Sequence, residues 1–301
     1  MPWPGRVHGR PPGGHTSRVI TVIVPAHNEA RVIGRLLRQL TSDARPGELD
    51  VIVVPNGCTD DTAEVAAAFG APVRVVSIAA ASKREALLAG DRAARGFPRL
   101  YVDADVETGT ADVRAIGDAL RDRPGILAAA PGRQLGLDGC PFLVRWYYDV
   151  WARLPQVREG LFGRGVIGVS EAGHERIASL PPVLADDLAA SLSFGPAERA
   201  VVPGARAVVH VPRTLRDLVR RRVRAAQGVA QIERTDQAPE STARTRPADL
   251  AAIARDDPRL APKVALFLAV AVIARFRARR TVARGDYSTW LRDESSRDTT
   301  G

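Results

Sequence analysis

The sequence predicts an α/β fold in which helices flank a mostly parallel, twisted β-sheet. Runs of Val, Ile and Leu alternate with amphipathic helical patterns between residues 18 and 110, and this alternation is typical of parallel strands joined by right-handed crossovers. One apolar run is followed by two aspartates, Asp103 and Asp105, one residue apart. With 301 residues, the chain is long enough for one large domain with additions or for two small domains.

The first half of the chain predicts strands and helices in strict alternation. Each strand is a short β-branched or apolar run, as in strands buried on both faces. Each helix repeats apolar residues every three or four positions, which places one face toward the core. A turn signal at 55–57 ends the second strand, and polar residues at 59–62 can cap the next helix. The expected elements are strand 18–25, helix 30–40, strand 49–54, helix 62–69, strand 72–78, helix 82–95 and strand 100–106.

The second half has a weaker pattern. Its aromatic-rich helix has rings at i, i+4 spacing, which fits either core packing or an exposed binding or membrane-facing surface. Its hairpin is expected to turn at Pro203-Gly204, because this dipeptide is a turn signal. The expected elements are helix 111–121, strand 126–130, aromatic helix 141–154, a helix that Asp186 and Asp187 open, edge hairpin 200–211, helix 214–229, and linker with a short helix over 232–262.

The net charge indicates which ligands the protein could bind, and the cysteine content indicates its redox compartment. The formal net charge is +9, with six arginines in 213–224 and five in 275–284. Such charge favours nucleotide phosphates, anionic lipid head groups or nucleic acid as partners, although a solvated basic face is the preferred explanation for any single arginine. No nucleic-acid-binding motif is recognisable. Only two cysteines occur, so a disulfide scaffold is unexpected and a reducing cytosol fits.

The chain ends and one apolar run bear on localisation. Residues 1–17 are rich in Pro and Gly and lack the apolar core of a signal peptide. The run 264–273 is shorter than the ~20 apolar residues that cross a bilayer. It is therefore expected to form either a buried helix or an interfacial anchor whose following arginines meet anionic lipid. We expect a cytoplasmic protein, peripheral on the inner face of the cell membrane if the run is an anchor.

Asp103 and Asp105 are the first candidate site. Alternation along a strand would place both side chains on one face, at the carboxyl edge where open α/β sheets bind ligands. Paired carboxylates are hard oxygen ligands that suit Mg²⁺ or Mn²⁺ held together with a diphosphate.

Two further sequence patterns are candidates for a catalytic or binding role. Asp186 and Asp187 fit a helix N-cap with a first-turn acid, and they could equally present a base to a cleft. Gly163, Gly165 and Gly168 form a literal G-x-G-x-x-G, but no apolar strand precedes it as dinucleotide binding requires. A glycine-lined loop that lets substrate approach the backbone is the better interpretation.

Six segments, in this order, resemble the motifs of glycosyltransferase family 2, the inverting sugar transferases of GT-A fold. The resemblance covers roughly residues 18–228. Pro55, Arg221 and Ala225 depart from the family pattern, which places an acid, Gln and Trp there; the last two argue against processive polysaccharide synthesis. The segments are VIVPAHNE at 22–29, VVPNGCTDDT at 53–62, SKREALLAG at 82–90, VDAD at 102–105, DD at 186–187 and TLRDLVRRRVRAAQG at 214–228.

The resemblance implies a role for each matching residue. Asp187 would be the catalytic base, and Asp105 would bind the metal. Asp103 would bind ribose or metal. A late histidine joins the metal in some related enzymes, so His210 is a further candidate ligand, with a structural role as the alternative. The expected donor-binding residues are Pro25, His27, Glu29, Asn56, Lys83, Asp103, Arg222 and Arg224, and those on the acceptor side are Gly163, Gly165 and Asp186.

The implied domain organisation has a catalytic core and a helical extension. The nucleotide-sugar-binding half is expected over 18–110 and the acceptor-binding half over 111–230. The expected order is a disordered leader at 1–17, the GT-A catalytic domain at 18–230, a C-terminal helical extension and candidate membrane-surface anchor at 231–290, and a loose tail at 291–301.

The implied activity is transfer of a sugar from a nucleotide-diphosphate donor, with UDP the first candidate, to an acceptor hydroxyl with inversion. It requires Mg²⁺ or Mn²⁺. The acceptor would be a carbohydrate, a lipid-linked or a small molecule, in cell-envelope, polysaccharide, glycolipid or secondary-metabolite glycan synthesis. An anionic membrane surface is a further expected partner, and nucleic acid is not.

Two alternatives stay open. A nucleotidyltransferase that makes sugar nucleotides shares such a sheet, but it would need a Gly-rich, basic phosphate loop after the first strand, where this chain has His27-Asn28-Glu29. A non-catalytic basic module could bind lipid or other polyanions through the Arg clusters, but it would not need Asp103, Asp105 and Asp187 in family register.

Overall fold

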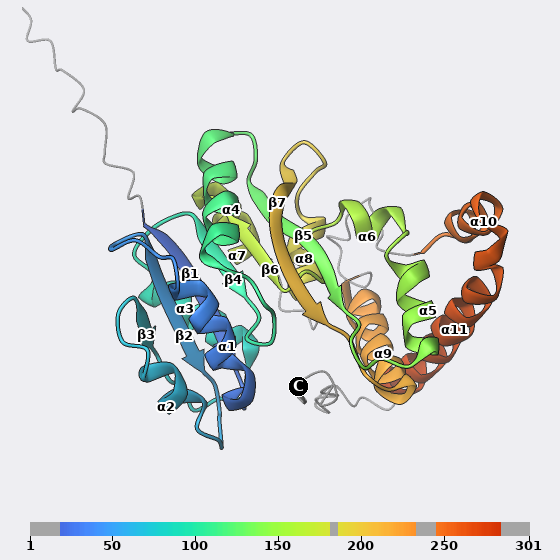
Figure 1. Cartoon of the computed structure of the whole chain (residues 1–301), viewed down its shortest axis with the longest axis horizontal. Coiled ribbons are helices and arrows are strands. Elements are labelled where there is room, and N and C mark those ends of the chain that lie inside the picture. Colours follow the sequence, from blue (N-terminus) through green and yellow to red (C-terminus); the bar gives the residue numbers. More distant parts are fainter. Residues whose placement is uncertain (1–18, 181–185, 233–244, 284–301) are drawn as a thin grey trace, which may run out of the picture.

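The structure is a computed structural model that describes residues 19–180, 186–232 and 245–283. The expected leader and tail lie outside these residues. Within them, the chain forms a seven-stranded sheet in the order β3-β2-β1-β4-β6-β5-β7, with helices on both faces and a helical layer at one end (Figure 1). The predicted α/β fold class is confirmed.

The elements follow the predicted alternation in the first half of the chain. The strands are β1 (Ile20–Ala26), β2 (Leu49–Pro55), β3 (Val73–Val75), β4 (Arg99–Val102), β5 (Ala128–Gly136), β6 (Val166–Val169) and β7 (Arg199–His210). The helices are α1 (Ala30–Thr41), α2 (Thr62–Ala67), α3 (Lys83–Ala93), α4 (Thr110–Asp122), α5 (Phe142–Trp151), α6 (Pro155–Glu159), α7 (Glu171–Ala178), α8 (Asp186–Leu192), α9 (Leu215–Ile232), α10 (Pro247–Asp256) and α11 (Ala261–Ala283), with a 3₁₀ turn η1 (Pro258–Leu260).

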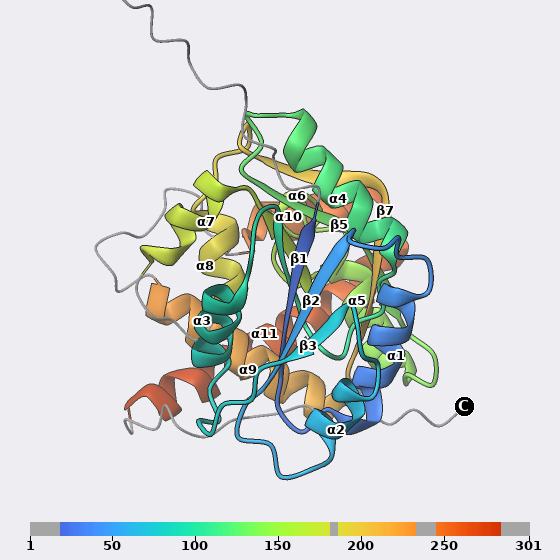
Figure 2. The ribbon, with the colours of Figure 1, turned by 90° about the vertical axis from the view of Figure 1, so that its left-hand side faces the viewer.

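The sheet is mixed. The adjacent strands β3, β2, β1 and β4 are all parallel to one another. Strand β5 is parallel to β7. β6 is antiparallel to both β4 and β5, and it lies between them. Helices α1, α2 and α4 cover one face, while α3, α7 and α8 cover the other (Figure 2). The second of these faces carries the candidate site described below.

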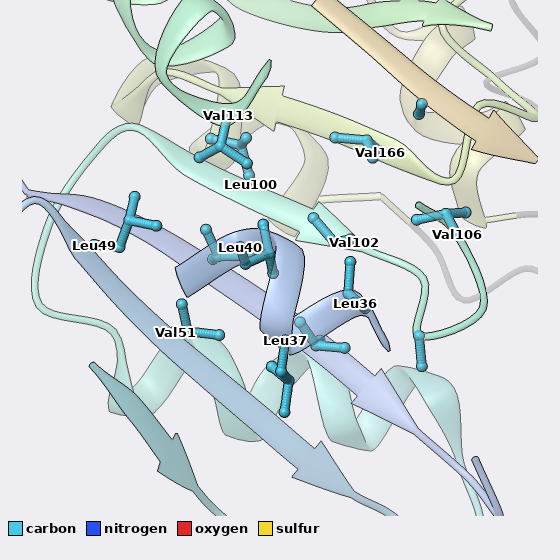
Figure 3. Packing of buried hydrophobic residues seen from close by; sticks show 14 of the residues in the cluster. Leu36, Leu37, Leu40, Leu49, Val51, Leu100, Val102, Val106, Val113 and Val166 are labelled. Atoms are coloured by element: carbon cyan, nitrogen blue, oxygen red, sulfur yellow. The ribbon is translucent and has the colours of Figure 1, made fainter. Parts of the chain in front are cut away.

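The core confirms the apolar patterns of the sequence. All residues of β1 and β2 are buried, as expected for strands covered on both faces. From α1, Leu36, Leu37 and Leu40 pack against β-strand residues such as Val51 and Leu100 (Figure 3). On the opposite face, Gly90 of α3 lies so close to the sheet that a Cβ would come within 2.4 Å of the Ile23 side chain.

A second hydrophobic cluster lies beyond the sheet and joins the C-terminal helices to α5. Helix α11 contacts both α5 and α9. The Tyr147 ring of α5 stacks on Phe267 of α11, with ring centroids 4.8 Å apart. Of the two interpretations of the aromatic helix, core packing therefore holds for Tyr147, whereas Phe142 is 63% exposed. The run 264–273 lies inside α11 and contributes to this cluster.

Two predicted elements are wrong in detail. The segment 200–211 is not a hairpin but one continuous strand, β7, parallel to β5. Its register jumps from Val202 to Arg206, so the Pro203-Gly204 turn signal produces a bulge, and Gly204 has the positive φ of +87° that this requires. Strand β4 also ends at Val102, earlier than expected.

Other expectations concern covalent and membrane features. Neither Cys58 nor Cys140 is part of a disulfide. None of the helices in the described ranges combines the length and the apolar character that a membrane span requires.

Candidate active site

The strand order brings several strand ends to one edge of the sheet. β1, β2 and β4 are parallel, so their carboxyl ends lie at the same edge. β6 is antiparallel to β4 and pairs Val166 with Val102, so the segment 160–165, here called the glycine loop, reaches this edge as well. In open α/β sheets, ligands bind at this edge.

Asp103 is the first residue after β4 and is held from two sides. Its backbone N–H donates to the carbonyl of Gly165, with N and O 2.8 Å apart. Its Oδ1 accepts a hydrogen bond from Lys83 Nζ at 2.9 Å. Both side chains remain partly exposed, 32% for Lys83 and 42% for Asp103, so a ligand can reach the pair. Because β4 ends before Asp103, Asp103 and Asp105 lie in the following turn, and the expectation that strand alternation aligns them is wrong.

Asp187 is the second residue of α8 and reaches the same loop. Its Oδ2 accepts a hydrogen bond from the backbone N–H of Gly163 at 2.9 Å, and its Oδ1 accepts one from the Leu188 N–H at 2.8 Å. Two backbone donors therefore fix the orientation of the carboxylate. The residue is exposed. Asp186 opens α8 as predicted, but its side chain lies outside the described part of the chain.

The glycine loop can make both contacts because of its backbone conformation. Gly163 has φ +61° and Gly165 has φ +66°, in the left-handed region that L-residues avoid. At Gly165 a Cβ would also come within 2.1 Å of the Val106 side chain. The glycines form a loop that does not follow a strand, as predicted; the approach of a substrate to its backbone stays a prediction.

Two arginines that sequence reasoning missed, Arg164, which is buried, and Arg133, which is half-buried, hold the glycine loop in place. Arg164 is 3% exposed, and its guanidinium donates to the carbonyls of Gly160 and Pro131, each at 2.9 Å. Arg133 donates to the carbonyls of Gly163 at 2.7 Å and Phe162 at 2.6 Å. Burial lowers the pKa of Arg164 to about 10. Burial, and next the charge of Arg164, lower the pKa of Arg133 to about 9. Both guanidinium groups therefore remain charged at neutral pH.

A cavity of about 540 Å³ connects the two aspartates. Its lining combines residues at this edge of the sheet with residues of α3, α7 and α8. Its walls include six of the predicted site residues, from both halves of the chain: Pro25, Lys83, Asp103, Gly163, Gly165 and Asp187.

The carboxyl ends of β1 and β2 form a second, polar neighbourhood. His27 Nδ1 donates to the carbonyl of Asn56 at 2.5 Å. Asn56 is 2% exposed, and its Nδ2 donates to the Ala26 carbonyl at 2.8 Å, while its Oδ1 is buried without a partner among the described residues. Glu29 is buried, and its backbone N–H donates to Thr62 Oγ1 at 2.8 Å.

This half of the chain matches a known family. The family model for Glycosyl transferase family 2 aligns with residues 21–150. The chain carries a glycosyltransferase family 2 domain. The match includes β1, β2, β4 and the Lys83–Asp103 pair, and it ends before the glycine loop and Asp187. The family resemblance expected from the sequence is confirmed.

Two solved structures similar to the chain are glycosyltransferases. A mannosyltransferase from Pyrobaculum calidifontis, solved with GDP-Man and Mn²⁺, aligns with a TM-score of 0.57 and 23% identity over 89% of this chain and 79% of that one. Glucosyl-3-phosphoglycerate synthase from Mycobacterium tuberculosis, solved with Mn²⁺, UDP and glucosyl-3-phosphoglycerate, aligns with a TM-score of 0.54 and 23% identity over 77% and 88%. These likenesses establish the GT-A fold.

A curated relative matches over a shorter segment. The 4,4'-diaponeurosporenoate glycosyltransferase of Staphylococcus aureus (strain USA300) is 45% identical over 56 residues. This segment is 19% of the chain and 14% of the relative. It supports the family and leaves the substrates of the family 2 domain open.

The acids of the family 2 domain fit a divalent cation only as a partial ligand set. No group of three or more His, Cys, Asp or Glu side chains in 19–180, 186–232 and 245–283 is placed to hold a metal ion. Asp103 supplies a partly exposed carboxylate, and Asp105 follows it in the same turn, where its carbonyl accepts from Arg35 at 3.3 Å. One or two carboxylates suit Mg²⁺ or Mn²⁺ when substrate phosphates complete the shell.

His210 has a protein partner. At the end of β7, its Nε2 donates to Glu107 Oε1 at 2.6 Å. Arg35 lies 3.4 Å from the same carboxylate oxygen. Burial raises the pKa of Glu107, but the hydrogen bond from His210 and the charge of Arg35 outweigh it, so the pKa lies below its usual value. This arrangement favours the structural interpretation of His210 over the metal-binding one.

The predicted arginines of α9 do not line the cavity. The Arg222 guanidinium lies 6.0 Å from the centre of the Tyr147 ring, on the side of the helical cluster. Arg221, at a position that departs from the family pattern, donates to the carbonyl of His210 at 3.2 Å. Arg224 is half-buried on the same helix.

Proposed function

We propose that this chain is an inverting glycosyltransferase that moves a sugar from a nucleotide-diphosphate donor, with a UDP-sugar as the first candidate, to an acceptor hydroxyl. One observation carries the proposal. Asp103, which is paired with Lys83, and Asp187, from the other half of the chain, contact Gly165 and Gly163 of one glycine loop beside one cavity. A donor-holding group and a separate carboxylate are what a single displacement at C1 requires.

The donor would bind at the carboxyl ends of β1, β2 and β4. Pro25, His27, Glu29 and Asn56 would surround the nucleoside, and the unpartnered Oδ1 of Asn56 is an acceptor that a nucleobase could use. Lys83 would donate to ribose or phosphate oxygens. The solved neighbours that contain GDP-Man or UDP are consistent with such a donor.

A divalent cation fits the acids of this edge. We propose that Asp103 and Asp105 would hold Mg²⁺ or Mn²⁺ together with the donor. Such an ion would neutralise charge on the leaving diphosphate. The Mn²⁺ in the solved neighbours supports this choice of metal class. His210 would join only by giving up its bond to Glu107. Arg222 packs near Tyr147. A role of Arg222 and Arg224 as hydrogen-bond donors to the phosphates therefore stays a prediction.

Asp187 would act as the catalytic base. The acceptor oxygen attacks C1 as the bond from C1 to the phosphate oxygen breaks, and the acceptor proton passes to the Asp187 carboxylate. The backbone donors of Gly163 and Leu188 orient that carboxylate without neutralising it. Gly163, Gly165 and Asp186 would then lie on the acceptor side of the reaction.

We also propose that α11 binds an anionic membrane surface. Its buried face packs on α5 and α9, but Leu268, Val272 and Phe276, spaced four residues apart, are 46%, 62% and 55% exposed. The arginines of 275–280 flank and follow Phe276, the last residue of this stripe. An exposed apolar stripe next to basic side chains is typical of interfacial helices. The enzyme would then work at the inner face of the membrane, on an acceptor of envelope, glycolipid or secondary-metabolite synthesis.

A thermal-shift screen tests the proposed function. UDP-, GDP- and dTDP-sugars are each added with and without Mn²⁺, because a ligand of the native state raises the apparent stability. We expect a rise in Tm with one nucleotide family, larger with Mn²⁺, and release of the nucleoside diphosphate in a coupled assay. Turnover of a sugar phosphate with a nucleoside triphosphate would instead identify a nucleotidyltransferase. No shift with any nucleotide sugar would refute the enzyme proposal.

A further inference from the structure

We propose that the cavity beside Asp103 and Asp187 is the acceptor site, and that it takes an elongated, largely apolar molecule with its reactive hydroxyl at the mouth. The inference rests on the glycosyltransferase function proposed above. It selects among the carbohydrate, lipid-linked and small-molecule acceptors that the sequence leaves open.

Much of the cavity lining is apolar, although Arg84 and Arg92 of α3 also belong to it. Leu87 and Leu88 of α3 lie on one side, Ile167 of β6 forms part of the floor, and Ile177 and Leu180 lie on the side of α7. The volume of about 540 Å³ is in the range of sites for small organic molecules. A sugar packed against these five apolar side chains would lose water without gaining hydrogen bonds from them, which is unfavourable.

A second polar cluster also lines the cavity, and its side chains bond to one another. Tyr101 Oη donates to Asp91 Oδ1 at 2.9 Å and lies 2.9 Å from His174 Nδ1. Arg99 donates to the same Asp91 oxygen at 2.9 Å. Burial raises the pKa of Tyr101 and lowers that of His174, so the phenol stays protonated at neutral pH. Since these groups bond to one another, they offer a carbohydrate little to bind.

The charged side chains beside the glycine loop are Lys83, Asp103 and Asp187, and all three line the cavity. Arg84 and Arg92 of α3 line it as well, whereas the polar neighbourhood of His27 and Asn56 lies outside it. The donor would approach from β1 and β2 and the acceptor body from the side of α7. An apolar molecule with one hydroxyl group matches this separation, because its hydroxyl reaches Asp187 while its body fills the apolar interior.

A series of linear primary alcohols, from 1-butanol to 1-decanol, tests the inference by titration calorimetry without any donor. Each buried methylene contributes about 0.8 kcal/mol, which is roughly a fourfold gain in affinity. We expect this increment along the series and no binding of glycerol. The same alcohols should become acceptors in the same order when a nucleotide sugar that binds is added. Affinity that does not change with chain length would overturn the inference.

Two leucines of equal exposure provide the variant and its control. Leu88 lines the cavity and is 36% exposed, and Leu215 on α9 is 37% exposed and lies outside it. We expect Leu88→Glu to weaken 1-decanol binding at least tenfold and Leu215→Glu to leave it unchanged, with nucleotide-sugar binding intact in both. If Leu88→Glu does not fold, Leu88→Ala should weaken binding three- to tenfold. Equal effects at the two positions would overturn the inference.

The two proposals fail in different ways. Alcohol binding without any nucleotide-sugar binding overturns the proposed function. Nucleotide-sugar binding without a dependence on alcohol chain length overturns the apolar acceptor alone.

Discussion

Gly163 donates its backbone N–H to the Asp187 carboxylate at 2.9 Å. Two residues further on, the carbonyl of Gly165 accepts the backbone N–H of Asp103 at 2.8 Å. The glycine loop therefore sets the position of one aspartate relative to the other, although 84 residues separate them in the sequence (187 − 103). Changes in the loop should affect both halves of the site together.

Gly165→Ala should be much more damaging than Gly139→Ala. Both glycines have similar positive φ angles, +66° and +70°, but a Cβ at Gly139 meets nothing within 4 Å, while at Gly165 it would clash with Val106. The left-handed backbone costs both variants about 1–2 kcal/mol. Overpacking adds about 1–3 kcal/mol at Gly165 alone. Urea unfolding should show this added loss as a lower free energy of unfolding for Gly165→Ala. Equal losses of unfolding free energy in the two variants would mean that the glycine loop and Val106 shift to accommodate the added Cβ.

Lys83→Met should weaken nucleotide-sugar binding. The sequence contains two lysines, Lys83 and Lys263, and each is paired with a carboxylate, Asp103 and Asp149 respectively. A lost charge-assisted hydrogen bond is worth about 1.5–3 kcal/mol, so the donor Kd should rise roughly 10- to 100-fold. Lys263→Met is the matched control and should leave the Kd unchanged. Similar donor affinities in the two variants would remove Lys83 from the donor site.

Replacing Leu268, Val272 and Phe276 by Ser should release the protein from anionic vesicles. These side chains form the exposed apolar stripe of α11, and their removal should lower partitioning into phosphatidylglycerol–phosphatidylcholine vesicles by roughly tenfold or more. Wild-type binding should also weaken with salt, because the neighbouring arginines contribute. Phe142→Ser, on α5 and 63% exposed, is the control. Sedimentation that is unchanged in the triple variant would contradict the anchor.

The ion pair of Glu48 and Arg114 should make stability depend on acid pH. Arg114 binds both carboxylate oxygens of Glu48, at 2.5 and 3.0 Å. The hydrogen bond from Arg114 is the main cause that lowers the pKa of Glu48 from 4.5 to about 2. A lowered folded-state pKa gives stability that is complete above pH 4.5 and is lost as pH falls toward 2.

Glu48→Gln should therefore remove part of the acid dependence. We expect the variant to be about 1 kcal/mol less stable at pH 7 and nearly equal to wild type only once the pH has fallen below the folded-state pKa of about 2. Denaturant unfolding at several pH values measures the difference. A constant difference from pH 7 to pH 2.5 would show that the ion pair does not titrate in this range.

Much of the candidate site can be predicted from the sequence, because its residues follow the ends of predicted strands or open a predicted helix. The β-branched runs and the helical periodicity locate β1, α1 and β2, and Asp103 follows β4 at the expected edge. Asp187 lies at the start of a helix, as its capping pattern predicts. These features are encoded locally, within a few residues of the side chains that matter.

The supports of the site could not be predicted, because they depend on distant parts of the chain. Arg133 donates to carbonyls 29 and 30 residues away in the sequence. No pattern in the residues around Arg133 predicts such a contact. The Pro203-Gly204 dipeptide reads as a turn, yet pairing of β7 with β5 on both sides of it makes it a bulge. The cavity likewise arises from α3, β6 and α7 together.

The most direct test of the account compares Asp187→Asn with Asp103→Asn. Donor Kd with Mn²⁺ and the rate of sugar transfer are measured for both variants. We expect Asp187→Asn to keep the wild-type donor Kd while transfer falls roughly 10²- to 10⁴-fold, the usual contribution of a general base, and Asp103→Asn to weaken donor binding. Loss of donor binding in Asp187→Asn, or transfer at the wild-type rate, would contradict the assignment of proton chemistry to Asp187.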